Sequence, residues 1–129
     1  MTIFRGQGWS ITLLPDWIGK EEENCTAVYH PNGKGSLNFS CYTKDSDVTK
    51  SDLVDIAKGQ NYADTVLSDA ALGDFLGITF VYEDDGVFWQ HWYVAKNNKA
   101  LFITYNCNLA VLGQERDDVQ MMISTLVKN

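Results

Sequence analysis

The chain has 129 residues, of which 17 are acidic and 10 are basic, so its formal net charge at pH 7 is −7. This length suits one domain over residues 1–129, and a hydrophobic fraction of 45% can fill one core without disulfides or a metal. The negative charge argues against binding to nucleic acid or to an anionic membrane, because affinity for phosphates comes mainly from lysine and arginine.

The N-terminal third predicts three strands. Residues 9–14 form the first strand-like run, which ends at a Pro-Asp turn because proline cannot donate a hydrogen bond to a neighbouring strand. A hairpin follows, with arms over residues 25–30 and 36–42 around a turn rich in glycine and asparagine. In the second arm, Leu37, Phe39 and Cys41 alternate with Ser36, Asn38 and Ser40. This alternation predicts a half-buried strand.

A short helix is predicted after Thr49, because threonine followed three residues later by Asp52 is typical of a helix N-terminus. Its apolar stripe consists of Leu53, Ile56 and Ala57. Gly59 is expected to weaken or end the helix. Residues 64–71 are ambiguous, and a short strand at residues 65–67 is one option.

Three further strand-like runs, at residues 75–82, 87–95 and 100–107, predict a β-meander. A four-residue second loop places Val94, Trp92, Gln90 and Phe88 opposite Leu101, Ile103, Tyr105 and Cys107, on a side that we expect to face the core. The other side carries Trp89, His91 and Tyr93 beside Phe102, Thr104 and Asn106. A first loop of two or four residues adds Ile78, Phe80 and Tyr82 to this second side, whereas a three-residue loop reverses the parity.

The last predicted element is a helix, in which Val119, Met122, Ile123 and Leu126 follow the i, i+3, i+4, i+7 spacing. Its first turn is acidic, with Glu115, Asp117 and Asp118. Both sides of the meander are rich in large apolar groups, so we expect helices above and below the sheet. The sequence therefore predicts an α+β fold, with a mainly antiparallel sheet of about six strands and helices on both faces.

No motif for catalysis or metal binding stands out. The acidic run at residues 45–49 begins like a calcium loop, but Lys50 and Ile56 stand where that loop needs glycine and glutamate. His30 and His91 have no histidine or cysteine at the spacing of a zinc site. His91 is instead expected to be packed, with a satisfied ring nitrogen. We therefore expect no cofactor, no metal and no enzymatic activity.

The cysteines and the N-terminus bear on the cellular compartment. The chain has three cysteines, Cys25, Cys41 and Cys107, and no two of them form a Cys-x-x-Cys motif. Each lies in a strand-like run, which predicts buried structural thiols. Residues 1–9 lack the apolar region of a signal peptide, and no run approaches the roughly 20 apolar residues of a spanning helix. A cytoplasmic location is expected.

Two acidic runs, at residues 21–23 and 83–85, are the predicted docking site for a protein partner. Loops on a rigid sheet often bind partners, and a negative field speeds encounter with a basic one. The residues assigned to this site are Glu21, Glu22, Glu23, Asp84 and Asp85, with Trp17 as an aromatic anchor. The alternative interpretation is that the acids are solvated turns and that Trp17 caps one end of the core.

The order of elements resembles that of small Mog1/PsbP-like domains found in uncharacterised bacterial proteins. The resemblance rests on the segment Ile11-Thr12-Leu13-Leu14-Pro15-Asp16-Trp17, the hairpin, the helix, a meander ending in Leu101-Phe102-Ile103-Thr104-Tyr105, and the closing helix. It implies an antiparallel sheet sandwiched by helices. It also implies a binding module rather than an enzyme, similar to immunity proteins or to chaperones of secreted toxins.

Three functional hypotheses follow. The leading one is a non-enzymatic protein-binding module, most concretely an immunity protein that neutralises a cognate bacterial toxin with a basic domain. The second is a chaperone or adaptor that shields an apolar segment of a secreted effector, with the protein acting as a monomer or a dimer. The third, from another class, is a small-molecule binder or an enzyme with a pocket walled by Trp89, His91 and Tyr93.

Overall fold

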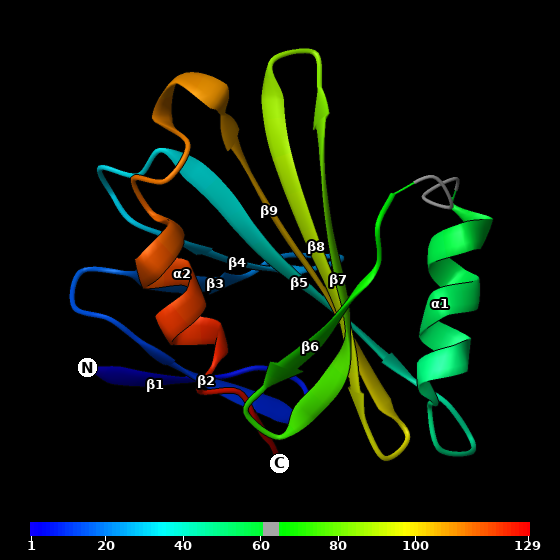
Figure 1. Ribbon diagram of the computed structural model, residues 1–129. Helices are drawn as coiled ribbons and strands as arrows, with labels where there is room; N and C mark the ends of the chain where they lie inside the picture. The colour runs from blue at the N-terminus through cyan, green and yellow to red at the C-terminus, as the bar shows by residue number, and fades with distance from the viewer. Residues whose placement is uncertain (61–64) are drawn as a thin grey trace.

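The computed structural model describes residues 1–60 and 65–129, in which two antiparallel sheets pack with two α-helices (Figure 1). The larger sheet contains, in spatial order, β3 (Ile18–Glu21), β4 (Thr26–Tyr29), β5 (Gly35–Thr43), β9 (Lys99–Asn108), β8 (Val87–Lys96), β7 (Phe75–Asp84) and β6 (Ser68–Leu72). The smaller sheet contains β1 (Thr2–Arg5), β2 (Trp9–Leu13) and β10 (Val127–Lys128). The helices are α1 (Lys50–Gly59), the 3-10 helix η1 (Leu109–Val111) and α2 (Arg116–Ile123). The expected α+β class and mainly antiparallel sheet are confirmed.

Strands β7, β8 and β9 form the predicted meander in the predicted register. Val94 pairs with Leu101 and Trp92 with Ile103, which confirms the pairing inferred from a four-residue second loop. The strands are longer than predicted, so the first turn shortens to Asp85 and Gly86, with φ angles of 51° and 80°. Two consecutive residues with positive φ are typical of a tight hairpin turn. This even-numbered loop adds Ile78, Phe80 and Tyr82 to the side of Trp89, His91 and Tyr93.

The predicted helix start is confirmed in atomic detail. The backbone N–H of Asp52 donates to Thr49 Oγ1 at 3.1 Å, and the N–H of Thr49 donates to Asp52 Oδ2 at 3.0 Å. These reciprocal bonds satisfy amides that the helix itself leaves without partners. The helix ends at Gly59, as its sequence indicates.

Several sequence-based boundaries need correction. Strands β1 and β3 were not predicted, because each is a four-residue edge strand with little apolar alternation. The optional strand at residues 65–67 is wrong: the strand lies at Ser68–Leu72, and residue 64 is outside the described part of the chain. Helix α2 ends at Ile123, and Leu126 is buried beyond it. Cys41 is exposed rather than buried, Cys25 is half-buried, and Cys107 alone meets the expectation for the three thiols.

The main core lies between the larger sheet, the smaller sheet and α2. It contains Trp9 and Ile11 from β2, Phe39 from β5 and Met122 from α2, each at most 2% exposed. The rings of Trp9 and Phe39 stack with their centroids 4.8 Å apart. Alternate residues of β8 and β9, such as Trp92 and Ile103, complete this core from the sheet. Burial of this one face of the larger sheet holds the two sheets together.

A smaller core lies on the other side of the larger sheet, beneath α1. Leu53 and Ala57 of α1 pack against Ile78, Phe80 and Tyr93. At Gly77 of β7, an added Cβ would lie 2.0 Å from the carbonyl oxygen of Tyr93 and 2.9 Å from Cδ1 of Leu53 on α1. Glycine is therefore needed at that position.

The two helices lie on opposite sides of the larger sheet (Figure 1), but the cover on the α1 side is incomplete. Helix α1 packs mainly on β7 and β8. Beside it, alternate side chains of β5 and β9 reach the surface: Asn38, Ser40 and Thr104 are half-buried, and Ser36 is exposed. The expected helical cover of both faces is thus only partly observed, and part of one face is open. No helix in the described part of the chain has the length and apolar character needed to cross a membrane.

Candidate functional site

The part of the larger sheet that α1 leaves uncovered is the candidate site, and we call it the open sheet face. It consists of Ser36, Asn38, Ser40 and Tyr42 of β5, Phe102, Thr104 and Asn106 of β9, and Trp89 of β8. All eight side chains are half-buried or exposed. The face therefore presents hydroxyl and amide groups together with aromatic rings.

The register of the strands arranges these residues in rows across the sheet. Ser36 pairs with Asn106, which pairs with Trp89 on the next strand. One row further along, Asn38 pairs with Thr104, and then Ser40 pairs with Phe102. Side chains alternate between the two sides of a strand, so Leu37 and Phe39, between these polar residues, point into the main core. The alternation seen in the sequence is what makes one side of β5 core and the other side accessible.

The open sheet face lacks formal charge although the chain as a whole is strongly acidic. Among the described residues, β4, β5, β8 and β9 place no aspartate, glutamate, lysine or arginine on this side of the sheet, and Lys20 of the edge strand β3, which pairs with Ala27, stands beside it. In these described strands, the one imidazole on this side is that of His91, and desolvation by burial lowers its pKa to about 4, so that it is neutral at pH 7. Charge depletion with enriched tyrosine and tryptophan is the composition of the centre of a protein interface. Serine and asparagine beside tyrosine are also typical of antibody binding surfaces.

His91 lies on the side of the larger sheet that faces α1, and both of its ring nitrogens contact tyrosine hydroxyls. Its Nε2 lies 2.9 Å from the hydroxyl of Tyr82, and its Nδ1 lies 3.4 Å from the hydroxyl of Tyr93. The Tyr93 hydroxyl donates in turn to Gln60 Oε1 at 2.9 Å. Desolvation by burial lowers the pKa of His91 from 6.5 to about 4, so the ring is neutral at pH 7. The expected packed histidine with a satisfied ring nitrogen is confirmed.

The hypothesis of a small-molecule pocket walled by Trp89, His91 and Tyr93 gains little support, because these side chains are largely packed against their neighbours. His91 and Tyr93 are only 6% and 3% exposed, and their polar atoms hydrogen-bond to each other and to neighbouring side chains. Trp89 is half-buried and stacks on Tyr82, with ring centroids 6.3 Å apart. Two of the three proposed wall residues are therefore part of the packing beneath α1.

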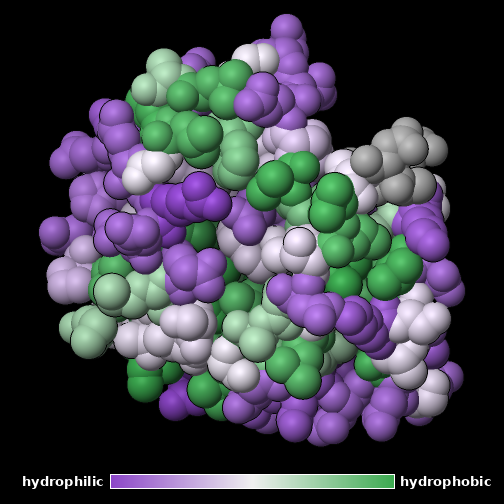
Figure 2. All heavy atoms as spheres, viewed as in Figure 1, coloured by the Kyte–Doolittle hydropathy of each residue, from purple (hydrophilic) through white to green (hydrophobic). Residues whose placement is uncertain are grey.

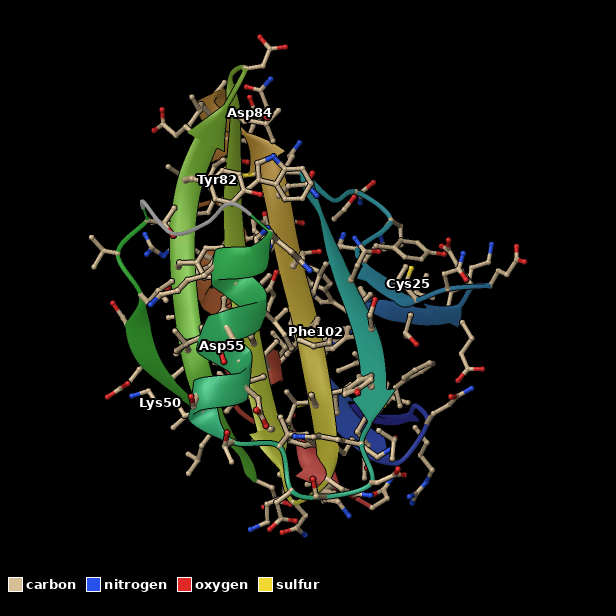
Figure 3. The ribbon with its side chains drawn as sticks, turned by 90° about the vertical axis from the view of Figure 1, so that its right-hand side faces the viewer. Cys25, Lys50, Asp55, Tyr82, Asp84 and Phe102 are labelled. Carbon is tan, nitrogen blue, oxygen red and sulfur yellow. The ribbon has the colours of Figure 1, made fainter. Side chains whose placement is uncertain are left out.

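The two predicted acidic runs lie far apart. Glu21 belongs to β3, and Glu22 and Glu23 follow it in the turn to β4, at one edge of the larger sheet. Asp84 ends β7 and Asp85 starts the turn to β8, four strands beyond β4 and at the opposite end of the strands (Figures 1 and 3). The structure does not combine these runs into one docking site. Asp84 nevertheless shares the register side of Tyr82, so it lies at the rim of the open sheet face.

Trp17, the predicted anchor, is packed into the protein. Its side chain is 8% exposed and belongs to the main core, where it meets the ring of His30 edge-on at 5.7 Å between centroids. This placement matches the alternative interpretation, in which Trp17 caps one end of the core. Because it is buried, the indole ring of Trp17 exposes little surface that a partner could contact.

Glu115 is a buried polar residue whose role the sequence did not reveal. Its sequence context indicates only an acidic first helical turn, but Glu115 is 7% exposed and precedes α2. Its Oε1 accepts a hydrogen bond from the hydroxyl of Tyr105 at 2.8 Å, and its Oε2 accepts one from the N–H of Lys34 at 3.1 Å. Burial and the neighbouring Glu115 carboxylate raise the pKa of Tyr105 well above its usual value. Glu115 thus ties α2 to β9 and to the turn between β4 and β5.

Replacing Tyr105 with phenylalanine is expected to lower the free energy of unfolding by about 1.5–3 kcal/mol, because the buried carboxylate loses its strongest donor. Urea denaturation followed by tryptophan fluorescence measures the change. Tyr42→Phe is the matched control, since Tyr42 is 48% exposed and its loss of a hydroxyl should cost less than about 0.5 kcal/mol. Equal stabilities of the two variants would show that Glu115 is not held by Tyr105.

No metal site emerges in the part of the chain that the structure describes, where no three histidine, cysteine or acidic side chains cluster suitably. Figure 2 shows apolar surface over η1, at the top of the molecule, among largely hydrophilic surroundings. Leu112, which follows η1, is 41% exposed.

Two solved structures share the fold at low sequence identity. A protein from Bacteroides thetaiotaomicron VPI-5482, known from crystals at 1.50 Å resolution, has a TM-score of 0.70 and 16% identity, over 95% of this chain and 45% of that one. LpqN of Mycobacterium tuberculosis, involved in cell envelope biogenesis, has a TM-score of 0.65 and 14% identity, over 92% of this chain and 82% of its own. The chain spans less than half the length of the Bacteroides protein. No family model and no curated protein matches the sequence, so these likenesses describe the fold alone.

Proposed function

We propose that this chain is a non-enzymatic protein-binding module and, most concretely, an immunity protein that neutralises a cognate bacterial toxin in the cytoplasm by covering it. The observation that carries the proposal is the open sheet face, which is free of formal charge in a chain with a net charge of −7. Depletion of charged residues is typical of the centre of a protein interface, whereas an ordinary soluble surface carries many charges. Its rigid strands also position the side chains at little entropic cost.

The acidic runs have a different role in this proposal. Asp84 and Asp85 lie at the rim of the open sheet face, where exposed charges act mainly on the rate of encounter. Glu21, Glu22 and Glu23 contribute to the overall negative field of the molecule. A toxin domain with a basic surface would be attracted by this field and then held by the uncharged centre. Binding strength should therefore depend more on Asn38, Ser40 and Thr104 than on the acids.

The proposal is tested with the product of a gene adjacent to the one that encodes this chain. Co-expression is expected to relieve growth inhibition by that product, and the purified proteins are expected to bind. Ser40→Arg and Asn106→Arg should each weaken binding at least about tenfold, because an arginine in the interface is desolvated without a partner. Isothermal titration calorimetry measures the two dissociation constants.

Gln120→Arg is the matched control, since Gln120 is exposed on α2, on the other side of the larger sheet. It adds the same charge and should leave the affinity unchanged. A bound partner whose affinity is equal for wild type, Ser40→Arg and Asn106→Arg would exclude the open sheet face. An adjacent toxin whose growth inhibition this protein fails to relieve would exclude the immunity function.

A second candidate function, a chaperone or adaptor for a secreted effector, is favoured by one observation. A groove of about 430 Å³ runs beside α1 and has mainly apolar walls, including Val48, Ile56 and Phe102. Shielding of an apolar effector segment needs such a concave surface. Under this alternative, a neighbouring effector would aggregate when expressed alone and remain dispersed when expressed with this protein.

We also propose that the architecture is a Mog1/PsbP-like αβα sandwich. The order of the elements supports this assignment, as does the placement of α1 and α2 on opposite sides of the larger sheet. The resemblance to that group implies a binding module rather than an enzyme. The assignment therefore agrees with a binding role rather than an enzymatic one.

A further inference from the structure

The groove beside α1 adjoins the open sheet face. Tyr42, Val48, Ile56 and Phe102 form its apolar walls. Tyr42 is 48% exposed, and the other three are half-buried, so the walls are accessible from solvent. Figure 3 shows Asp55 on α1 and Phe102 on β9 on the two sides of this region. Phe102 belongs both to the groove and to the open sheet face, which makes the two surfaces continuous.

The charges around the groove leave an excess of acid. Lys44 Nζ lies 3.1 Å from Asp52 Oδ2, so these two lining residues neutralise each other. Asp52 is further held by the Thr49 N–H, and this bond and Lys44 lower the pKa of Asp52. Asp55 is exposed on α1 and has no ion pair within the described ranges 1–60 and 65–129. A single uncompensated carboxylate therefore stands at the edge of an apolar groove.

We propose that this groove receives a large apolar side chain of the partner protein that has a lysine or arginine next to it in sequence. The apolar residue would fill the space between Tyr42, Ile56 and Phe102, and the neighbouring cation would pair with Asp55. The inference rests on the proposed protein-binding function and adds the chemistry of the partner. Charge complementarity selects this occupant, because an acidic segment would face Asp55 with a like charge.

The test uses three blocked tetrapeptides titrated into 15N-labelled protein. Ac-Lys-Phe-Leu-Lys-NH2 is expected to shift the amide signals of Tyr42, Ile56 and Phe102, with a dissociation constant of about 1 mM. Ac-Glu-Phe-Leu-Glu-NH2 should bind at least about fivefold more weakly, because its charges repel Asp55. Ac-Lys-Ser-Ser-Lys-NH2 should cause no saturable shifts, because it lacks the apolar side chains.

Two variants assign the effect to the groove. Asp55→Asn should remove most of the difference between the lysine and glutamate peptides, and Asp118→Asn on α2 is the control that should preserve it. Tyr42→Ser, at an exposed position, should weaken binding of the lysine peptide about fivefold or more through lost apolar contact. Circular dichroism verifies that each variant is folded.

Equal binding of the lysine and glutamate peptides, or shifts centred away from the groove, would overturn the proposal. Concentration-dependent dimerisation abolished by Tyr42→Ser would also overturn it, because a second copy of the chain would then occupy the groove. These peptide measurements do not involve the natural partner. Failure of the open sheet face variants to weaken partner binding would instead overturn the proposed function and leave the peptide results standing.

Discussion

Phe39→Ala is expected to lower the free energy of unfolding by about 3–5 kcal/mol, because it removes a fully packed ring and leaves a cavity. Phe39 is 1% exposed and stacks on Trp9 between the two sheets. The surrounding strands are held by their hydrogen-bonded neighbours and can collapse only slightly into the space. Chemical denaturation with urea measures the loss.

Phe102→Ala is the informative comparison, because Phe102 lies one residue from Ile103, the cross-strand partner of Phe39, but on the opposite side of the sheet. Its ring is half-buried. It packs edge-on against Tyr93, with 5.0 Å between the ring centroids, but the rest of the ring is only partly covered by other side chains. We expect a loss of about 1–2 kcal/mol, well below that of Phe39→Ala. Equal losses would mean that the open sheet face is as well covered as the main core.

Stability is expected to fall by about 3 kcal/mol between pH 7 and pH 4 through His91 alone. Burial holds the pKa of His91 at about 4 in the folded protein, against 6.5 when exposed. Between these values the unfolded chain binds the proton and the folded protein does not, so the free energy of unfolding rises with pH. Above about pH 6.5, His91 is neutral in both states and the folded protein keeps its full stability. As the pH falls from about 6.5 to about 4, the free energy of unfolding decreases by about 1.4 kcal/mol per pH unit.

His91→Phe separates this effect from the titration of carboxylates in the same range. Phenylalanine preserves the stacking on Phe80, whose ring centroid lies 4.9 Å from that of His91. Denaturation of both proteins at several pH values should show a smaller decrease for the variant, by about 3 kcal/mol at pH 4. Parallel curves for wild type and variant would show that His91 is not desolvated as described.

Much of the fold was predictable because local patterns determine it. The register of β8 and β9 followed from alternation over two long strands, and the start of α1 followed from Thr49 and Asp52. Strands β1 and β3 could not be found in this way, since each has only four residues and lies at the edge of its sheet, paired with a single neighbour, β2 or β4. Such pairing leaves little trace in four residues.

The candidate site was only half visible in the sequence. Parity placed Phe102, Thr104 and Asn106 on one side together, and alternation gave Ser36, Asn38 and Ser40 of β5 a common side. That these two sets adjoin depends on the pairing of β5 with β9, which joins residues that are 56 to 72 positions apart, from Thr43 with Lys99 to Gly35 with Cys107. How much of the sheet α1 covers likewise depends on tertiary packing. The acidic runs were conspicuous in sequence, but their separation in space depends on the same topology.

The most direct test of the account is to map the surface that a bound partner covers. Cross-saturation from an unlabelled, adjacent-gene partner to the 15N-labelled protein identifies amides close to the interface. We expect the strongest effects at Asn38, Ser40, Thr104 and Asn106, on β5 and β9. Strong effects confined to α2, or to residues 21–23, with none on these two strands, would contradict this expectation.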